Sequence, residues 1–125
     1  MAELASIAET TFNPDRLIAG PADLILTRQI TLISGQNLTR GAVLGKITAS
    51  GKYNLSLSAA GDGSQTPDAI LAEDCNASGG DKVTIAYFKG RFNEDRLTFG
   101  TAHTAASTQE GLRAKGIDLV KPVAA

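Results

Sequence analysis

The chain has 125 residues, of which 42% are hydrophobic and 20% are charged, and its formal net charge is −1. This size and composition predict one soluble globular domain with a single core. We expect no direct nucleic acid binding, because the lysines and arginines are scattered rather than gathered on a basic face, and there is no Trp on which bases could stack.

Residues 1–21 differ from the rest of the chain. They begin MAELASIAETTF, without a basic leader, so we expect no signal peptide and synthesis in the cytosol. No run approaches the ~20 apolar residues that span a bilayer, so no membrane association is expected. Pro14 favours extended backbone at Asn13. We predict a flexible arm over residues 1–21 and a folded domain over residues 22–125, although an inert tail fits the arm equally well.

The folded domain reads as a series of short strands. Runs rich in Leu, Ile and Val alternate with turn residues, which is typical of β structure. We expect strands in ADLILTRQITLI (22–33), AVLGKIT (42–48), YNLSLS (53–58), DAILAE (68–73) and KVTIAYF (82–88). In YNLSLS, alternation places Tyr53, Leu55 and Leu57 on one side of the strand. Val83 and Ile85 share a face with Tyr87 in KVTIAYF.

One helix is expected near the C-terminus, in STQEGLRAKG (107–116). Ser107 is a plausible N-cap, Glu110 three residues later fits a capping box, and Gly116 is a stop signal. IDLVKP (117–122) then forms a last strand. The fold class predicted from the sequence is therefore mainly β with a short C-terminal helix (α+β).

Two stretches resemble ligand loops but fail on detail. In TRGAVLGKITASGKY, Gly41 and Gly45 are separated by three residues instead of four, and Lys46 is followed by Ile47, so a phosphate-binding loop is not predicted. Gly45 is better explained by a bulge or a close backbone approach. In DCNASGGDKVTI the last position of a calcium loop is Ile85 instead of Glu. We predict no metal and no cofactor.

Catalysis is not predicted either. The single His, His103, lies in a loop of small residues, and no Gly-x-Ser-x-Gly motif occurs. Cys75 is the only cysteine and fits a small apolar filler. Glu94 and Asp95 are adjacent, which is typical of a solvated turn. An enzyme that uses Glu94, Asp95 or His103 would need the fold to bring them together in a pocket.

The order of elements resembles the head decoration protein family of tailed bacteriophages, the family of lambda head decoration protein D. Three motifs carry the resemblance together: Arg-Gly-x-x-Leu-Gly, Ala-Ile-Leu-Ala-Glu-Asp and Gly-Arg-Phe-Asn-Glu, followed by LRAKGIDLVKPV. It covers roughly residues 24–123. The resemblance implies a β-tulip domain that forms homotrimers on the outer capsid surface, at three-fold and local three-fold positions. Its partner would be the major capsid protein, and its role would be to stabilise the expanded head against packaged DNA.

The arm is the candidate capsid contact. An extended ETTFNPDR segment could add a strand to an exposed sheet edge on the shell, with Phe12 as apolar anchor and Arg16 as ion-pair partner. The candidate capsid-binding residues are Thr10, Thr11, Phe12, Asn13, Pro14, Asp15 and Arg16. The alternative to a decoration protein is a small β-barrel module that binds a ligand or a carbohydrate, which would need a cleft with exposed aromatic side chains.

Overall fold

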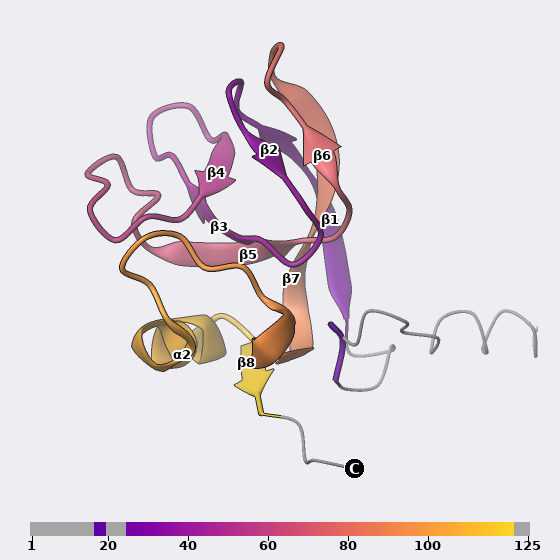
Figure 1. The fold of residues 1–125 in the computed structure, drawn as a ribbon, viewed down its shortest axis with the longest axis vertical. Helices are drawn as coiled ribbons and strands as arrows, with labels where there is room; N and C mark the ends of the chain where they lie inside the picture. Colours follow the sequence, from indigo (N-terminus) through magenta and orange to yellow (C-terminus); the bar gives the residue numbers. More distant parts are fainter. Residues whose placement is uncertain (1–16, 20–24, 122–125) are drawn as a thin grey trace, which may run out of the picture.

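The computed structural model describes residues 17–19 and 25–121, which form one body (Figure 1). The predicted arm residues 10–16 lie outside the described residues. The strands are β1 (Leu26–Leu32), β2 (Asn37–Leu38), β3 (Val43–Lys46), β4 (Tyr53–Leu55), β5 (Pro67–Leu71), β6 (Cys75–Asn76), β7 (Lys82–Asn93) and β8 (Ile117–Val120). A 3-10 helix (Glu94–Arg96) follows β7, and helix α2 (Ala105–Ala114) precedes β8.

Five of the strands close into a mixed barrel. The order is β1-β4-β3-β5-β7, and β1 also pairs with β7, which closes the circle. Strand β8 extends the sheet by pairing in parallel with β7, while β2 and β6 form a separate two-stranded sheet. In Figure 1 that small sheet lies at one end of the molecule, and α2 and β8 lie at the other. The prediction of a mainly β fold with one short C-terminal helix is confirmed.

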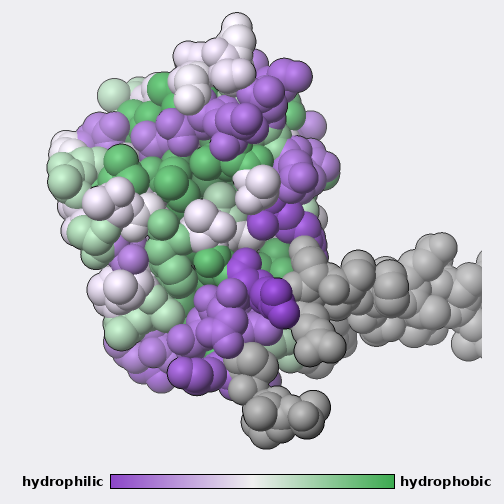
Figure 2. Space-filling model, in the orientation of Figure 1, coloured by the Kyte–Doolittle hydropathy of each residue, from purple (hydrophilic) through white to green (hydrophobic). Residues whose placement is uncertain are grey.

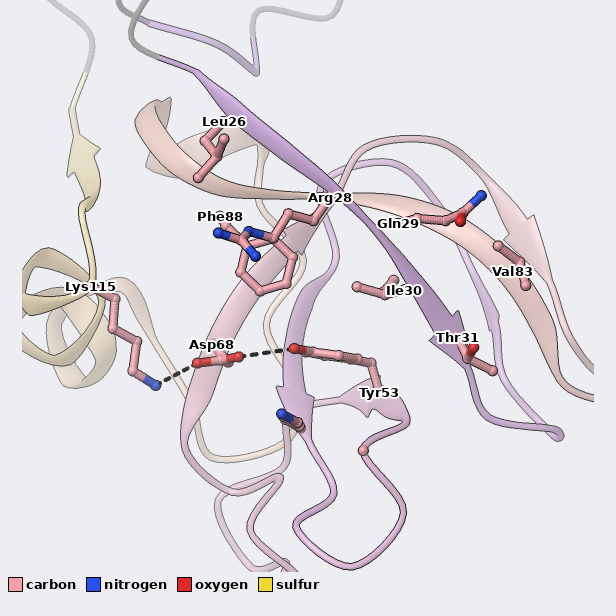
Figure 3. Close-up of a pocket in the computed structure, with 12 residues that line it drawn as sticks. Leu26, Arg28, Gln29, Ile30, Thr31, Tyr53, Asp68, Val83, Phe88 and Lys115 are labelled. Carbon is pink, nitrogen blue, oxygen red and sulfur yellow. Dashed lines mark hydrogen bonds and ion pairs between the residues drawn. The ribbon is translucent and has the colours of Figure 1, made fainter.

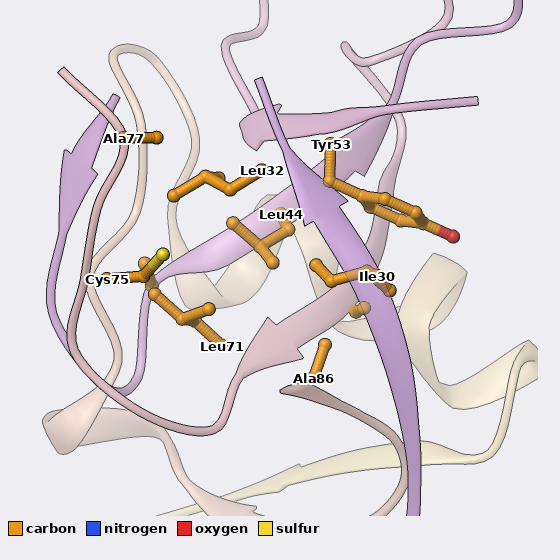
Figure 4. Packing of buried hydrophobic residues seen from close by; sticks show 10 residues of the cluster. Ile30, Leu32, Leu44, Tyr53, Leu71, Cys75, Ala77 and Ala86 are labelled. Atoms are coloured by element: carbon orange, nitrogen blue, oxygen red, sulfur yellow. The ribbon is translucent and has the colours of Figure 1, made fainter. Parts of the chain in front are cut away.

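The core is divided into two clusters by the barrel wall. The inner cluster fills the barrel and includes Leu32, Leu44 and Leu71, all fully buried (Figure 4). Because successive strand residues point to opposite faces, the neighbours Val43 and Ile70 point outward instead, where they join the second cluster. DAILAE therefore reads as a continuous apolar run because both of its faces are covered.

The second cluster lies between the barrel wall and its cover. Phe92 of β7, Leu112 of α2 and Ile117 of β8 are all fully buried in it. Leu17 joins them with a 1% exposed side chain, and its carbonyl accepts a hydrogen bond from the Asn93 N–H at 2.7 Å. Leu17 is thus fixed to the barrel.

Two local predictions were wrong. Strand β4 ends at Leu55, so Leu57 does not continue the buried side of Tyr53 and is 39% exposed. The turn away from the strand is held by Ser56, whose buried hydroxyl donates to the Ser64 carbonyl at 2.7 Å. The predicted start of the strand at Tyr53 is confirmed.

The helix begins earlier than Ser107. Its N-cap is Thr104, whose hydroxyl accepts from the Ser107 N–H, while the Ser107 hydroxyl accepts from the Thr104 N–H. Ser107 is therefore the third helical residue of the capping box, and its short hydroxyl does the work predicted for Glu110. Glu110 instead pairs with Arg113 at 2.6 Å on the helix surface. The predicted stop is confirmed, since Gly116 follows the helix with φ +95°.

The close approach predicted at Gly45 is confirmed. The pairing of β3 with β5 shifts its register between Leu44 and Gly45. A Cβ at Gly45 would lie 1.9 Å from the Ser64 carbonyl oxygen, so no other residue fits without moving that loop. Gly45 thus admits the loop that covers this part of the barrel.

Candidate functional site

A groove of about 680 Å³ runs along β1. It opens because β1 meets β4 at a single position, Leu32 opposite Tyr53, and the two strands separate from there. Arg28 and Ile30 line the groove from the barrel face of β1, while Gln29 and Thr31 line it from the outer face. Side chains from both faces of one strand meet in one hollow only where the hollow follows the strand's edge.

The opposite bank of the groove carries a chain of polar contacts (Figure 3). The Tyr53 hydroxyl donates to one carboxylate oxygen of Asp68 at 3.3 Å, and the Lys115 ammonium contacts the other at 2.9 Å. Burial first, and the neighbouring Asp68 carboxylate second, raise the pKa of Tyr53 to about 12. Tyr53 therefore stays a neutral hydrogen-bond donor at physiological pH and holds Asp68 in place.

The groove is cationic. Arg28, Lys46 and Lys115 line it together with one carboxylate, that of Asp68. The Arg28 guanidinium lies 5.9 Å from the centre of the Phe88 ring, which faces it from β7 (Figure 3). A smaller hollow of about 210 Å³ adjoins the groove and shares Lys46, Asp68 and Lys115 with it.

The fold pairs His103 with a serine, but the pair cannot act as nucleophile and base. His103 Nε2 lies 2.9 Å from the Gln65 carbonyl oxygen and 3.2 Å from Ser56 Oγ. A carbonyl only accepts, so Nε2 carries the proton and has no lone pair with which to deprotonate Ser56. The Ser56 hydroxyl already donates to Ser64, so the group fixes loops to one another.

The residues of the stretch that resembles a calcium loop serve structural contacts. Asp74 accepts from the Arg40 N–H at 2.8 Å, and Asn76 accepts from both the N–H and the hydroxyl of Ser78.

Glu94 and Asp95 lie on the 3-10 helix, outside both hollows. Over residues 17–19 and 25–121, no three His, Cys, Asp or Glu residues are grouped closely enough to hold a metal ion. None of the described helices is long and apolar enough to cross a membrane.

The three motifs singled out in the sequence hold the architecture together. Arg40 donates to the Ala72 carbonyl at 3.0 Å and to the Tyr87 hydroxyl at 2.6 Å, which ties the segment before β3 to β5 and β7. Gly41 adopts φ +99°, and a Cβ there would lie 2.7 Å from the Arg96 carbonyl oxygen. Phe92 of the third motif is fully buried. These residues specify a scaffold and no chemical reaction.

Comparison with known proteins decides the family. The family model for bacteriophage lambda head decoration protein D matches residues 6–117. The chain belongs to this family. It is therefore a structural, non-enzymatic phage protein that binds the capsid and lies on the capsid surface. A search of curated proteins found no match.

The family match and the described structure cover different parts of the chain. The match begins at residue 6 and so includes the candidate residues 10–16, which lie outside the described structure. The groove along β1 was missed by sequence reasoning. Its one local signal is Arg28, a cation that interrupts the apolar alternation of β1. Cys75 is buried in the inner cluster, as expected for a small apolar filler.

Proposed function

We propose that this decoration protein binds the outer surface of the expanded capsid as a homotrimer, at three-fold and local three-fold positions. Its major capsid protein partners are clamped together there, which stabilises the head against the pressure of packaged DNA. The observation that carries this proposal is the family match, which spans residues 6–117 and so includes both the scaffold and most of the arm.

The arm residues Thr10, Thr11, Phe12, Asn13, Pro14, Asp15 and Arg16 are proposed as the capsid contact. Their attachment point supports this role, because Leu17 is buried and Ile18 forms a β-bridge with Phe92. A segment that leaves the body from a fixed point can present an extended backbone to a sheet edge on the shell. Phe12 would supply an apolar anchor and Arg16 an ion pair.

Trimer formation would multiply a weak contact. Three arms on one body engage the shell together, and such linkage can exceed the affinity of one arm by ~10² or more when the geometry permits simultaneous binding. No single arm then needs a strong motif. A β-tulip arrangement, as the family resemblance implies, is the proposed description of this small domain, whose barrel closes between β1 and β4 at one paired position only.

The direct test is co-sedimentation with expanded, undecorated capsids of the parent phage. We expect saturable binding near one chain per capsid subunit, and weaker binding after Phe12→Ala or after removal of residues 1–16. The truncation stops before Leu17, because that side chain belongs to the second core cluster. Equal binding by all forms would move the contact from the arm to the body, and no binding by the full-length chain would refute the proposal.

The oligomeric state needs its own measurement. Sedimentation equilibrium of the free protein should give three times the mass of a 12.9 kDa chain. If the free protein is a monomer that still binds capsids, the decoration role stands and the proposal of a trimer is refuted. The ligand-binding alternative is less well supported, because the groove is open and cationic and its two aromatic residues are shielded. Tyr53 is buried, and Arg28 lies over the Phe88 ring.

A further inference from the structure

We propose that the groove along β1 is a docking site for an extended, acidic segment of the major capsid protein. This segment would add as a further strand to the edge of β1 that no described strand occupies from Leu26 to Thr31. This inference rests on the proposed function, because it assumes that the capsid is the partner. It adds a second contact, made by the folded body, to the contact proposed for the arm.

The backbone of β1 supplies the first argument. β1 is paired with β7 along its whole length, from Leu26 to Leu32. On its other edge, the described residues place no strand beside it between Leu26 and Thr31, since β4 pairs only at Leu32. An edge of this kind presents unpaired N–H and C=O groups, which is the arrangement that strand addition uses.

The direction of these groups can be worked out from one hydrogen bond. The Ile33 N–H donates to the Tyr53 carbonyl at 2.9 Å, so it points toward β4. Backbone groups alternate sides along a strand, so both groups of Gln29 and the N–H of Thr31 point the same way, into the groove. The Thr31 carbonyl faces the Tyr53 N–H in the single β1–β4 pairing. The backbone groups of Ile30 and Arg28 point toward β7 and complete the existing ladder.

Charge supplies the second argument and identifies the partner's chemistry. Three cationic side chains and one carboxylate line the groove, and that carboxylate, Asp68, is already engaged by Tyr53 and Lys115. Arg28 rests over the Phe88 ring, and Lys46 has an exposed side chain at the opposite bank. An incoming strand with acidic side chains would satisfy these cations, whereas a basic strand would be repelled.

The groove also offers apolar contacts for the strand's other side chains. Leu26 and Val83 line it and are 42% and 62% exposed. Side chains of an added strand alternate between two faces, so one set would face the cations at the barrel mouth and the other set would cover Val83. The edge from Leu26 to Thr31 is about 20 Å long at ~3.3 Å per residue, enough for a strand of ordinary length.

Two matched substitutions test the strand addition. Gln29→Pro removes an N–H that points into the groove and leaves the β1–β7 ladder intact, since proline is accepted at strand edges. Gln29→Ala removes the same side chain but keeps the N–H. In co-sedimentation with expanded, undecorated parent capsids, we expect Gln29→Pro to bind about tenfold or more weakly than the full-length wild type, and Gln29→Ala to bind nearly as well.

A charge pair keeps the test decisive if Gln29→Pro misfolds. Lys46→Glu reverses a cation in the groove, and Arg96→Glu makes the same charge change on the 3-10 helix, outside the groove. Weaker binding by Lys46→Glu than by Arg96→Glu supports an acidic partner. Equal binding by wild type, Gln29→Pro and Lys46→Glu overturns this inference while the decoration role stands. Failure of the wild type to bind refutes the proposed function, and this inference with it.

The competing occupant is this protein's own arm, from the same or a neighbouring copy. Residues 1–16 contain Glu3, Glu9 and Asp15 against Arg16, so they too are acidic. Hydrogen exchange of the free full-length protein distinguishes the two. We expect the Gln29 and Thr31 amides to exchange quickly in the free protein and slowly on the capsid. Slow exchange in the free protein would show that the groove is already filled, and would overturn the inference.

Discussion

The outer face of β7 is covered at one end and uncovered at the other. Comparing the two ends shows which apolar side chains the fold buries and which it leaves exposed. Tyr87 is 8% exposed, because the Phe92 ring packs against its ring with the two ring centres 5.3 Å apart, and the Arg40 guanidinium lies over it. Ile85 and Val83 occupy the same face, opposite Gln29 and Thr31 of β1, yet they are 41% and 62% exposed.

The alternation of apolar residues is the same at both ends, so it does not decide burial. The decisive factor is the cover, which α2, β8 and Leu17 provide at the Tyr87 end. Figure 2 shows that apolar surface on the face it displays gathers in the middle, with polar surface above and below. Apolar surface that no part of the described chain covers is available to a partner.

The largest predicted effect contrasts the two ends directly. Phe92→Ala removes a fully buried ring from the second cluster and should lower the free energy of unfolding by about 3–5 kcal/mol. Val83→Ala should change it by no more than about 0.5 kcal/mol, because that side chain is mostly solvated. Urea unfolding of both variants measures the difference. Similar losses would mean that Val83 is covered in the free protein.

Gly45→Ala tests how tightly the loop at Ser64 closes on the barrel. The new Cβ would meet the Ser64 carbonyl, so we expect a loss of about 1–3 kcal/mol as the loop shifts. Gly61→Ala is the control, since nothing lies within 4 Å of a Cβ there, and its expected change is within about 0.5 kcal/mol. A neutral Gly45→Ala would contradict the close approach.

The helix that covers the second cluster can be tested at its cap. Thr104→Ala should lower the free energy of unfolding by about 1 kcal/mol, because it leaves the Ser107 N–H without its side-chain acceptor. Glu110→Ala removes only an exposed ion pair and should cost less than about 0.5 kcal/mol. Thermal unfolding of the two variants ranks them. A larger loss of stability for Glu110→Ala would favour the capping box with Glu110 that the sequence predicted.

The smallest predicted effect is a loss of stability in acid. Hydrogen bonds from Ser64 lower the pKa of Asp62, and the contacts of Lys52 and of the Ser34 N–H lower that of Asp81. The unfolded chain binds protons more readily at both positions, so their contribution is present above the ordinary pKa of 3.8 and is lost as the pH falls below it. Urea midpoints measured down to about pH 3 should fall less steeply in Asp62→Asn.

Local patterns predicted much of the scaffold. Alternation located β3, β5 and β7, and the spacing argument at Gly45 located a close approach. The helix was found, but its first turn was placed too late, because Ser107 can serve either as N-cap or as the third residue of a capping box. The choice depends on whether the backbone turns into the helix at Thr104 or at Ser107, and the sequence does not show this.

The groove could not be predicted in the same way. It exists because β1 pairs with β4 at one position only, while it pairs with β7 along its length. Both pairings join residues far apart in the sequence. Arg28 gave a local hint, yet a lone cation in a strand is equally consistent with an exposed barrel rim. The capsid role came from the order of motifs, whose residues Arg40 and Gly41 act in the scaffold rather than at the contact.

The most direct measurement is a cryo-electron microscopy map of expanded capsids decorated with this protein. We predict that the groove along β1 faces the shell and that capsid protein density forms a strand beside β1 between Leu26 and Thr31, with acidic side chains near Arg28 and Lys46. A map in which this edge of β1 faces solvent, or is filled by the arm of a decoration protein, would contradict the account.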